Sequence, residues 1–166
     1  RDYITIASEL ALRGKDDSQK ILTVQLDRIS NPDRKARFEF IIPSLSNDSN
    51  IRDNFFELIK KEENREVEPW VQSAVAYLHH PLRSKEAEKY IRPSLELLEE
   101  IQRTGDIFFP ARFINATLSG HQSASARKIV NQFLDDYPNY SPPLKLKILQ
   151  AADNLFRASI ITEQDN

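Results

Sequence analysis

The sequence contains no cysteine and no methionine, and only three of its 166 residues are glycine. Without cysteine, disulfides, thiolate metal sites and thiol catalysis are excluded. A typical glycine content of about 7% would give roughly a dozen glycines in a chain of this length. Because glycine is the usual residue at left-handed backbone positions and in phosphate-binding loops, the sequence predicts few hairpins and no loop that cradles phosphate.

The chain begins at Arg1 and has no methionine with which to start its own translation. We therefore expect it to be cut from a larger polypeptide, in which residues 1–166 form a single helical domain and the polar residues 162–166 form a frayed tail.

No signal-peptide pattern and no apolar run of about 18 residues is visible, so the sequence predicts no membrane partner. The compartment is left open between the cytoplasm and the periplasm or cell envelope, because a lack of cysteine fits both.

Positive and negative charges nearly balance. There are 23 Lys and Arg residues against 25 Asp and Glu residues, which gives a net charge of −2. Proteins that bind nucleic acid or anionic membranes by bulk charge carry a basic surplus, so this composition argues against a nucleic-acid partner. A chain of this length can bury roughly 70% of its unfolded surface, enough for a hydrophobic core without disulfides or metals.

Apolar residues recur at helical spacing along most of the chain. The predicted helices begin close to residues 2, 18, 33, 49, 67, 84, 106, 123 and 141. Alternate starts are 31, 34, 39 and 35 residues apart, the length of a helix-pair repeat. We therefore predict an all-α fold of about nine helices, in which antiparallel pairs stack as an α-α superhelix of the HEAT or armadillo kind.

Prolines and capping residues set the predicted boundaries. Pro43 is expected to kink or end the helix that opens at Asn31-Pro32-Asp33, and Pro93 is expected to bend or split its helix after Tyr90-Ile91. Asp106 is expected to be the N-cap of the next helix. The aromatic residues Phe55, Trp70, Phe108, Phe109 and Phe113 are expected in the core.

The three histidines are the first candidates for chemistry. His79 and His80 are adjacent, and neighbouring helical side chains point about 100° apart, so they cannot chelate one metal from one helix. Both are interpreted as capping or packing residues at a helix end, and His121 as a surface residue or a brace of its turn. No zincin motif H-E-x-x-H, nucleophile elbow or P-loop occurs. The sequence therefore predicts no metal ligand and no catalytic residue within this chain.

Three arginines near interruptions of the helical pattern are candidates for ligand binding: Arg83, Arg103 and Arg112. The planar guanidinium fork suits the carboxylate of a peptide. The alternative is that each makes an ordinary surface ion pair.

Five segments carry a resemblance to a known family: 36–46, 52–59, 64–83, 90–110 and 146–158. The most specific are the stretch from Trp70-Val71 to the His-His-Pro-Leu-Arg turn and the stretch Gly-Asp-Ile-Phe-Phe-Pro at 105–110. In these segments the chain resembles the C-terminal helical domain of the M1 family of zinc aminopeptidases, the gluzincins.

The resemblance implies a parent enzyme that removes N-terminal residues from peptides. An upstream catalytic domain of the same polypeptide would hold zinc through H-E-x-x-H and a later glutamate, and a zinc-bound water would attack the first peptide bond. The helical domain would cover that site, limit substrate length and gate access. The family's catalytic residues fall outside this chain, so the chain alone is expected to hold no zinc or other cofactor and to be inactive. Some members place an arginine of this domain on the substrate's carboxylate, for which Arg83, Arg103 and Arg112 are the candidates.

Two other readings stay open on the sequence alone. The first is a stand-alone α-solenoid scaffold that binds a protein or peptide, which would expose a large apolar patch. The second is a small helical enzyme, which would need a buried cluster of converging charged residues.

Overall fold

A computed structural model describes residues 2–14 and 17–164. Within these ranges there are ten α-helices, two short 3-10 helices and no strand, which confirms the all-α prediction with one helix more than expected. The chain divides into two compact units, Arg1–Leu78 and His79–Asn166. Each unit is described by itself, and the prediction of a single domain with superhelical stacking stays a prediction.

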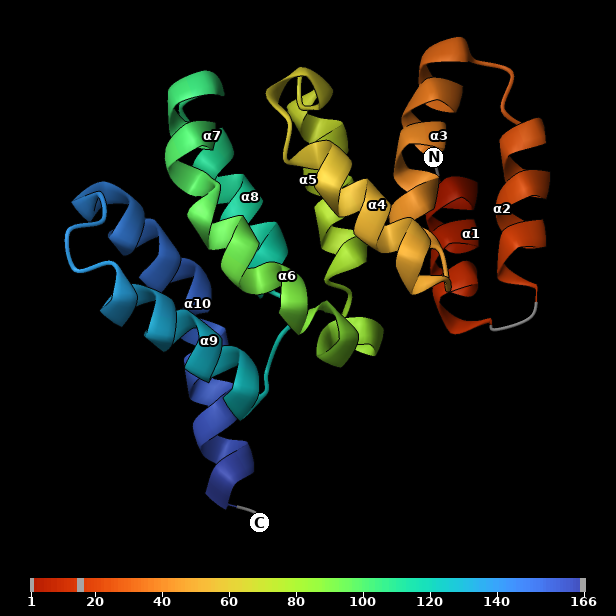
Figure 1. Cartoon of the computed structure of the whole chain (residues 1–166). Coiled ribbons are helices and arrows are strands. Elements are labelled where there is room, and N and C mark those ends of the chain that lie inside the picture. Colours follow the sequence, from red (N-terminus) through yellow and green to blue (C-terminus); the bar gives the residue numbers. More distant parts are fainter. Residues whose placement is uncertain (1, 15–16, 165–166) are drawn as a thin grey trace. The chain divides into compact units, whose positions relative to one another are not determined.

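The first unit is an array of antiparallel helices (Figure 1). Its elements are α1 (Asp2–Arg13), α2 (Ser18–Asp27), α3 (Pro32–Leu45), α4 (Ser49–Ile59), η1 (Glu62–Asn64) and α5 (Glu68–Leu78). α1 packs on α2, and α3 packs on α5 and α4. Leu22, Phe38, Leu45 and Ile59 are almost fully buried, so each helix contributes one apolar face to this core.

The second unit packs its last two helices against earlier ones. Its elements are η2 (Pro81–Arg83), α6 (Ser84–Glu96), α7 (Leu98–Thr104), α8 (Phe109–Leu118), α9 (Ala124–Asp136) and α10 (Pro142–Gln164). α10 packs on α8 and α9, and α6 packs on α9. The core holds Phe109, Phe113 and Phe133. Helix α10 continues through Gln164, into the tail predicted to fray, and residues 165–166 lie outside the described part.

Side-chain caps start several helices where the sequence predicts them. The side chain of Asn31 accepts from the Arg34 amide at 2.9 Å and opens α3. Asp48 opens α4 in the same way through the Asn50 amide. Such caps satisfy amides in the first helical turn that have no partner within the helix.

Ser123 caps α9 and gives a direct test of this local chemistry. Its hydroxyl accepts from the Ala126 amide at 3.1 Å and donates to Glu88 at 2.6 Å. We expect Ser123→Ala to lower the free energy of unfolding by about 1 kcal/mol, measured by urea denaturation. Ser125→Ala is the matched control, because Ser125 also donates to Glu88 but does not cap the helix. An equal loss in both variants would contradict the capping role.

Pro43 and Pro93 both lie inside helices, close to the helix end. α3 contains Pro43 and ends only after Leu45, and α6 runs through Pro93 to Glu96. The helix does not split after Tyr90-Ile91: the break lies at Leu97, and α7 after it is the additional helix. The alternative, a bend of α6 at Pro93, stays a prediction. Proline removes one helical hydrogen bond, and the buried side chains around Pro93, Ile91 and Leu95 among them, hold the helix in register despite that loss.

The start of α8 also differs from the sequence prediction. Asp106 accepts from the Phe108 amide at 2.9 Å and forms a turn, while the helix begins at Phe109. Phe109 and Phe113 are buried as predicted, but the prediction for Phe108 is wrong, because this ring is 61% exposed. Moving the helix start from Asp106 to Phe109 leaves Phe108 on the outer side of the turn.

Candidate functional site

The three arginines that are candidates for binding a carboxylate lie on three different elements of the second unit. Arg83 belongs to η2 and is buried. Arg103 is exposed in the last turn of α7. Arg112, on α8, is exposed and lies over the ring of Phe108, 5.6 Å from its centroid. Their role toward a peptide carboxylate stays a prediction.

Two histidines that are far apart in the sequence meet in the structure. His79 follows the last residue of α5, and His121 lies in the turn between α8 and α9. The His79 Nδ1 and His121 Nε2 atoms are 2.8 Å apart, within hydrogen-bond distance. Only 1% of His79 and 2% of His121 is exposed, so His121 is not the surface residue that was one of its two predicted roles. The ring of Tyr90 lies edge-on to that of His79.

The outer nitrogens of this pair have no partner. His79 Nε2 and His121 Nδ1 are buried and make no hydrogen bond. In a pair of neutral imidazoles, one inner nitrogen donates and the other accepts, which leaves one outer donor and one outer acceptor unpaired whichever tautomers are present. Because buried polar atoms are almost always bonded, this pair is an unusual feature of the core.

Burial keeps both rings neutral. Desolvation lowers the pKa of His79 well below its ordinary value, and the nearby His121 lowers it further. Desolvation also lowers the pKa of His121, while the negative charge of Glu88 opposes that shift. Rings with so little exposed surface are out of reach of a dissolved substrate, so the pair contributes to the packing of the core. Because both rings are buried in the neutral form, acid is expected to lower the stability of the fold.

Gly120 allows the two histidines to meet. A Cβ atom at Gly120 would lie 1.8 Å from the carbonyl oxygen of His79 and 3.0 Å from its carbonyl carbon. The turn after α8 therefore lies directly on the backbone that carries His79. Only glycine fits at this close approach.

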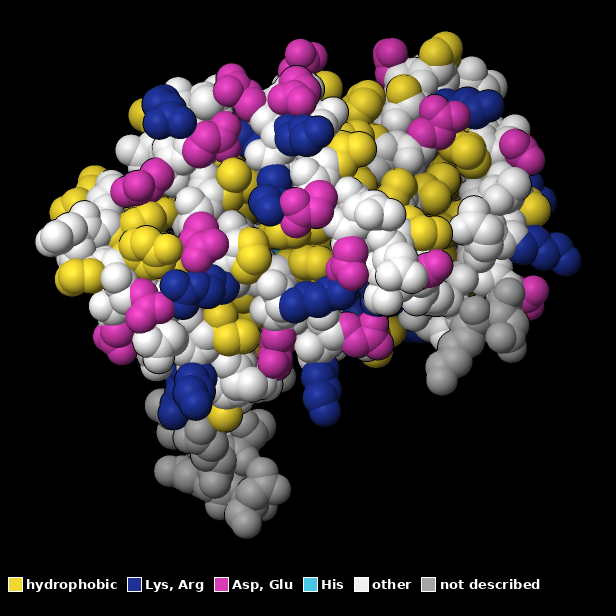
Figure 2. All heavy atoms as spheres, viewed as in Figure 1, with side chains coloured by type: hydrophobic (Ala, Val, Ile, Leu, Met, Phe, Trp, Pro, Cys, Tyr) yellow, Lys and Arg dark blue, Asp and Glu magenta, His cyan; other side chains and the backbone are white. Residues whose placement is uncertain are grey.

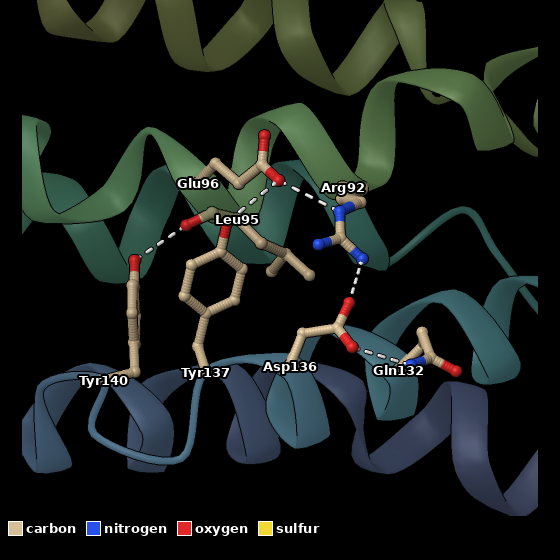
Figure 3. A network of polar contacts seen from close by, with 7 residues as sticks. All are labelled: Arg92, Leu95, Glu96, Gln132, Asp136, Tyr137 and Tyr140. Carbon is tan, nitrogen blue, oxygen red and sulfur yellow. Dashed lines mark hydrogen bonds and ion pairs between the residues drawn. The ribbon is translucent and has the colours of Figure 1, made fainter.

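A polar network on the surface of the second unit ties α6 to α9 (Figure 3). Arg92 of α6 pairs with Glu96 at 2.9 Å and with Asp136 of α9 at 2.6 Å. Gln132 donates to the other oxygen of Asp136 at 2.7 Å. The guanidinium of Arg92 and then the amide of Gln132 lower the pKa of Asp136. Every member of this network has a partner of opposite polarity, so the network holds the two helices together.

Two tyrosines extend the same network toward α10, as Figure 3 shows. The Tyr140 hydroxyl donates to the Leu95 carbonyl at 2.7 Å, and the Tyr137 hydroxyl reaches Glu96 at 3.4 Å. Burial, followed by the charge of Glu99, raises the pKa of Tyr140. The phenol is therefore neutral near pH 7 and acts as a hydrogen-bond donor that fastens the end of α6.

The first unit exposes an apolar groove between α1 and α2. Tyr3, Ile6 and Leu10 line it from α1, and Val24 lines it from α2. All four side chains are exposed, and Tyr3 is the most exposed at 75%. Apolar side chains gathered in one groove are the surface feature that a protein-binding scaffold would need.

The rest of the surface shows no concentration of one kind of charge on the face in view. Acidic and basic side chains are intermingled over the face shown in Figure 2, in keeping with the balanced composition. Among residues 2–14 and 17–164, no group of three or more His, Cys, Asp or Glu side chains could hold a metal ion. None of the helices in these ranges is both long enough and apolar enough to cross a membrane.

Comparison of the chain with protein-family models, with curated proteins and with solved structures gives no significant match.

Proposed function

We propose that this chain is the non-catalytic C-terminal helical domain of an M1 zinc aminopeptidase, which covers the active site and shapes substrate access. The observation that supports the proposal is the location of the resembling segments. They fall on α3–α8 and α10 of an all-α fold, the architecture that the resemblance implies.

The most specific segment also has a structural explanation. In the His-His-Pro-Leu-Arg turn, His79 forms the buried pair with His121, and His80 accepts from the Leu82 amide at 3.3 Å. Pro81 begins η2, and Arg83 is buried at its end. Each residue other than Leu82 therefore has a packing or capping role, as expected in a domain whose turns stabilise the fold and carry no catalytic residues.

The experiment is to isolate the native polypeptide from its source cells with antibodies raised against this chain. We expect a mass several times the 19.2 kDa of the chain. We also expect about one bound zinc per polypeptide and hydrolysis of an aminoacyl arylamide that stops when a chelator removes the metal. The 166-residue chain alone should show neither stoichiometric zinc nor hydrolysis. A large native polypeptide without zinc-dependent aminopeptidase activity would overturn the proposal.

The second candidate function is a stand-alone α-solenoid that binds a protein or peptide, which the apolar groove between α1 and α2 favours. The same isolation separates the two candidates. A native polypeptide near 19.2 kDa that retains a bound partner would support the scaffold. Substituting Ile6 or Leu10 with aspartate should then release the partner, because a charged side chain cannot be buried in an apolar contact without a large desolvation penalty.

A further inference from the structure

A second cavity in the first unit combines two arginines with an apolar floor. It lies where α1, α3 and α5 meet and has a volume of about 210 Å³. Ile4, Phe38 and Ile41 form the apolar part of its lining. Phe38 and Ile41 are almost fully buried, so the floor is formed by the hydrophobic core itself.

The sequence of α3 places the cations beside this floor. Arg34 and Arg37 are three residues apart, and Phe38 and Ile41 follow Arg34 by four and seven residues. These spacings put all four side chains on one face of the helix. The face thus changes from cationic to apolar over two turns, which is the arrangement an amphipathic anion needs.

The two guanidinium groups have no carboxylate partner within the described chain. Arg37 donates to the Ser73 hydroxyl at 3.0 Å, and Ser73 in turn donates to the Pro69 carbonyl at 2.8 Å. This relay orients Arg37 and uses only one of its five N–H donors. No Asp or Glu lines the cavity.

Other arginines of the first unit are already engaged by the fold. Arg52 donates to the carbonyl of Ser46 before α4, and Arg65 donates to the carbonyls of Ile59 and Lys60 at its end. Two like charges on one helix face repel each other slightly. Arg34 and Arg37 are both exposed, so their guanidinium groups are open to an anion that comes from outside the unit.

Two further hydroxyl groups line the same cavity. Thr5 contributes one from α1, and Tyr77 contributes the other from α5. Both can donate to an anion that the arginines hold. Together with the guanidinium groups they would surround a carboxylate with donors from three helices, as in charge-assisted recognition of carboxylates.

We propose that this cavity binds a carboxylate attached to a compact apolar group. The carboxylate lies on Arg34 and Arg37, and the apolar group lies on Ile4, Phe38 and Ile41. Cavities for drug-sized ligands measure about 300–1,000 Å³, so a volume of 210 Å³ suits a single residue or a small acid. Two sources share this chemistry: the C-terminal residue of a peptide, and a free organic acid. The proposal does not rest on the proposed function.

The test measures binding to the whole 166-residue chain by NMR titration. N-acetyl-leucine supplies the carboxylate and the apolar group, N-acetyl-leucinamide lacks the charge, and N-acetyl-glycine lacks the apolar side chain. We expect N-acetyl-leucine to bind at least tenfold more tightly than either analogue, and its affinity to fall as salt is added. Equal affinities for the acid and the amide, or no binding of N-acetyl-leucine, would overturn the proposal.

Substitutions localise the binding to this cavity. Arg34→Gln and Arg37→Gln should each weaken the binding of N-acetyl-leucine at least fivefold. The matched control is Arg28→Gln, which removes an exposed arginine at the end of α2 that lies outside the cavity. If Arg28→Gln weakens binding as much as the other two variants, the effect is one of net charge and the site is refuted.

A second titration identifies the source of the carboxylate. Arg37 and Ser73 also line a neighbouring groove that contains Trp70 and Pro69. A short peptide that ends in leucine should bind several-fold more tightly than N-acetyl-leucine if the upstream residues lie in that groove, and Trp70→Ala should remove this gain. If 4-methylpentanoic acid binds as tightly as the peptide, the ligand is a free acid. Both results require that the carboxylate binds in the cavity, so both support the proposal.

Discussion

Gly120→Ala should destabilise the second unit by about 3 kcal/mol or more, the loss expected when an added methyl group cannot be accommodated in a packed interior. The new Cβ atom would lie 1.8 Å from the His79 carbonyl oxygen and 3.4 Å from the Pro81 nitrogen. Both are backbone atoms, which cannot rotate away as a side chain could. No described glycine has a positive φ, so the loss would come from the steric overlap alone.

The measurement is urea denaturation of the variant beside Gly14→Ala. At Gly14 the nearest atom to an added Cβ is the Leu10 carbonyl oxygen at 3.3 Å, a contact that a shift of a few tenths of an ångström relieves. We expect Gly14→Ala to change the free energy of unfolding by less than about 1 kcal/mol. If Gly120→Ala is no less stable than Gly14→Ala, the turn after α8 does not lie on the His79 backbone.

Acid should destabilise the chain well before its carboxylates are protonated, because the His79–His121 pair is buried and neutral. The unfolded chain binds a proton at each histidine as the pH falls below about 6.5. The folded state resists, since the pKa values of His79 and His121 are lowered. The contribution of the pair is therefore fully present above that pH and is lost as the pH falls toward the folded pKa values.

The expected slope is about 1.4 kcal/mol of unfolding free energy per pH unit for each histidine that stays neutral in the folded state. The effect should be larger for His79, because the charge of Glu88 partly offsets the shift at His121. Urea denaturation at intervals between pH 7.5 and pH 5.5 measures the slope in a range where most carboxylates remain ionised. The proton uptake on unfolding, obtained from the same data, gives the number of histidines involved.

Substitutions test whether the His79–His121 pair causes this pH dependence of the unfolding free energy. His121→Gln removes one titrating ring and keeps a polar side chain that can form a hydrogen bond with His79. The number of protons taken up on unfolding should therefore fall by about one, and the pH slope of the unfolding free energy should fall with it. The control His80→Gln removes a histidine outside the pair, next to it in the sequence. It should leave the slope due to His79 and His121 in place. An unchanged slope in His121→Gln would show that the pair does not cause the acid sensitivity.

The sequence by itself determined the helices of this chain. Apolar spacing, the caps at Asn31, Asp48 and Ser123, and the scarcity of glycine are local properties that act within one or two turns, so they predict the all-α fold and most helix starts. Local rules were wrong where packing overrides them. α6 continues through Pro93 because buried neighbours hold it, and Phe108 is exposed because α8 begins three residues after Asp106.

Only the tertiary structure decided which polar residues meet. His79 and His121 are 42 residues apart, and no spacing rule connects two residues that follow different helices at that distance. Arg34, Arg37, Ser73 and Tyr77 likewise share a cavity only because α3 packs on α5. The physical reason is that helix formation depends on neighbours along the chain, whereas a site depends on which helix faces are buried against each other.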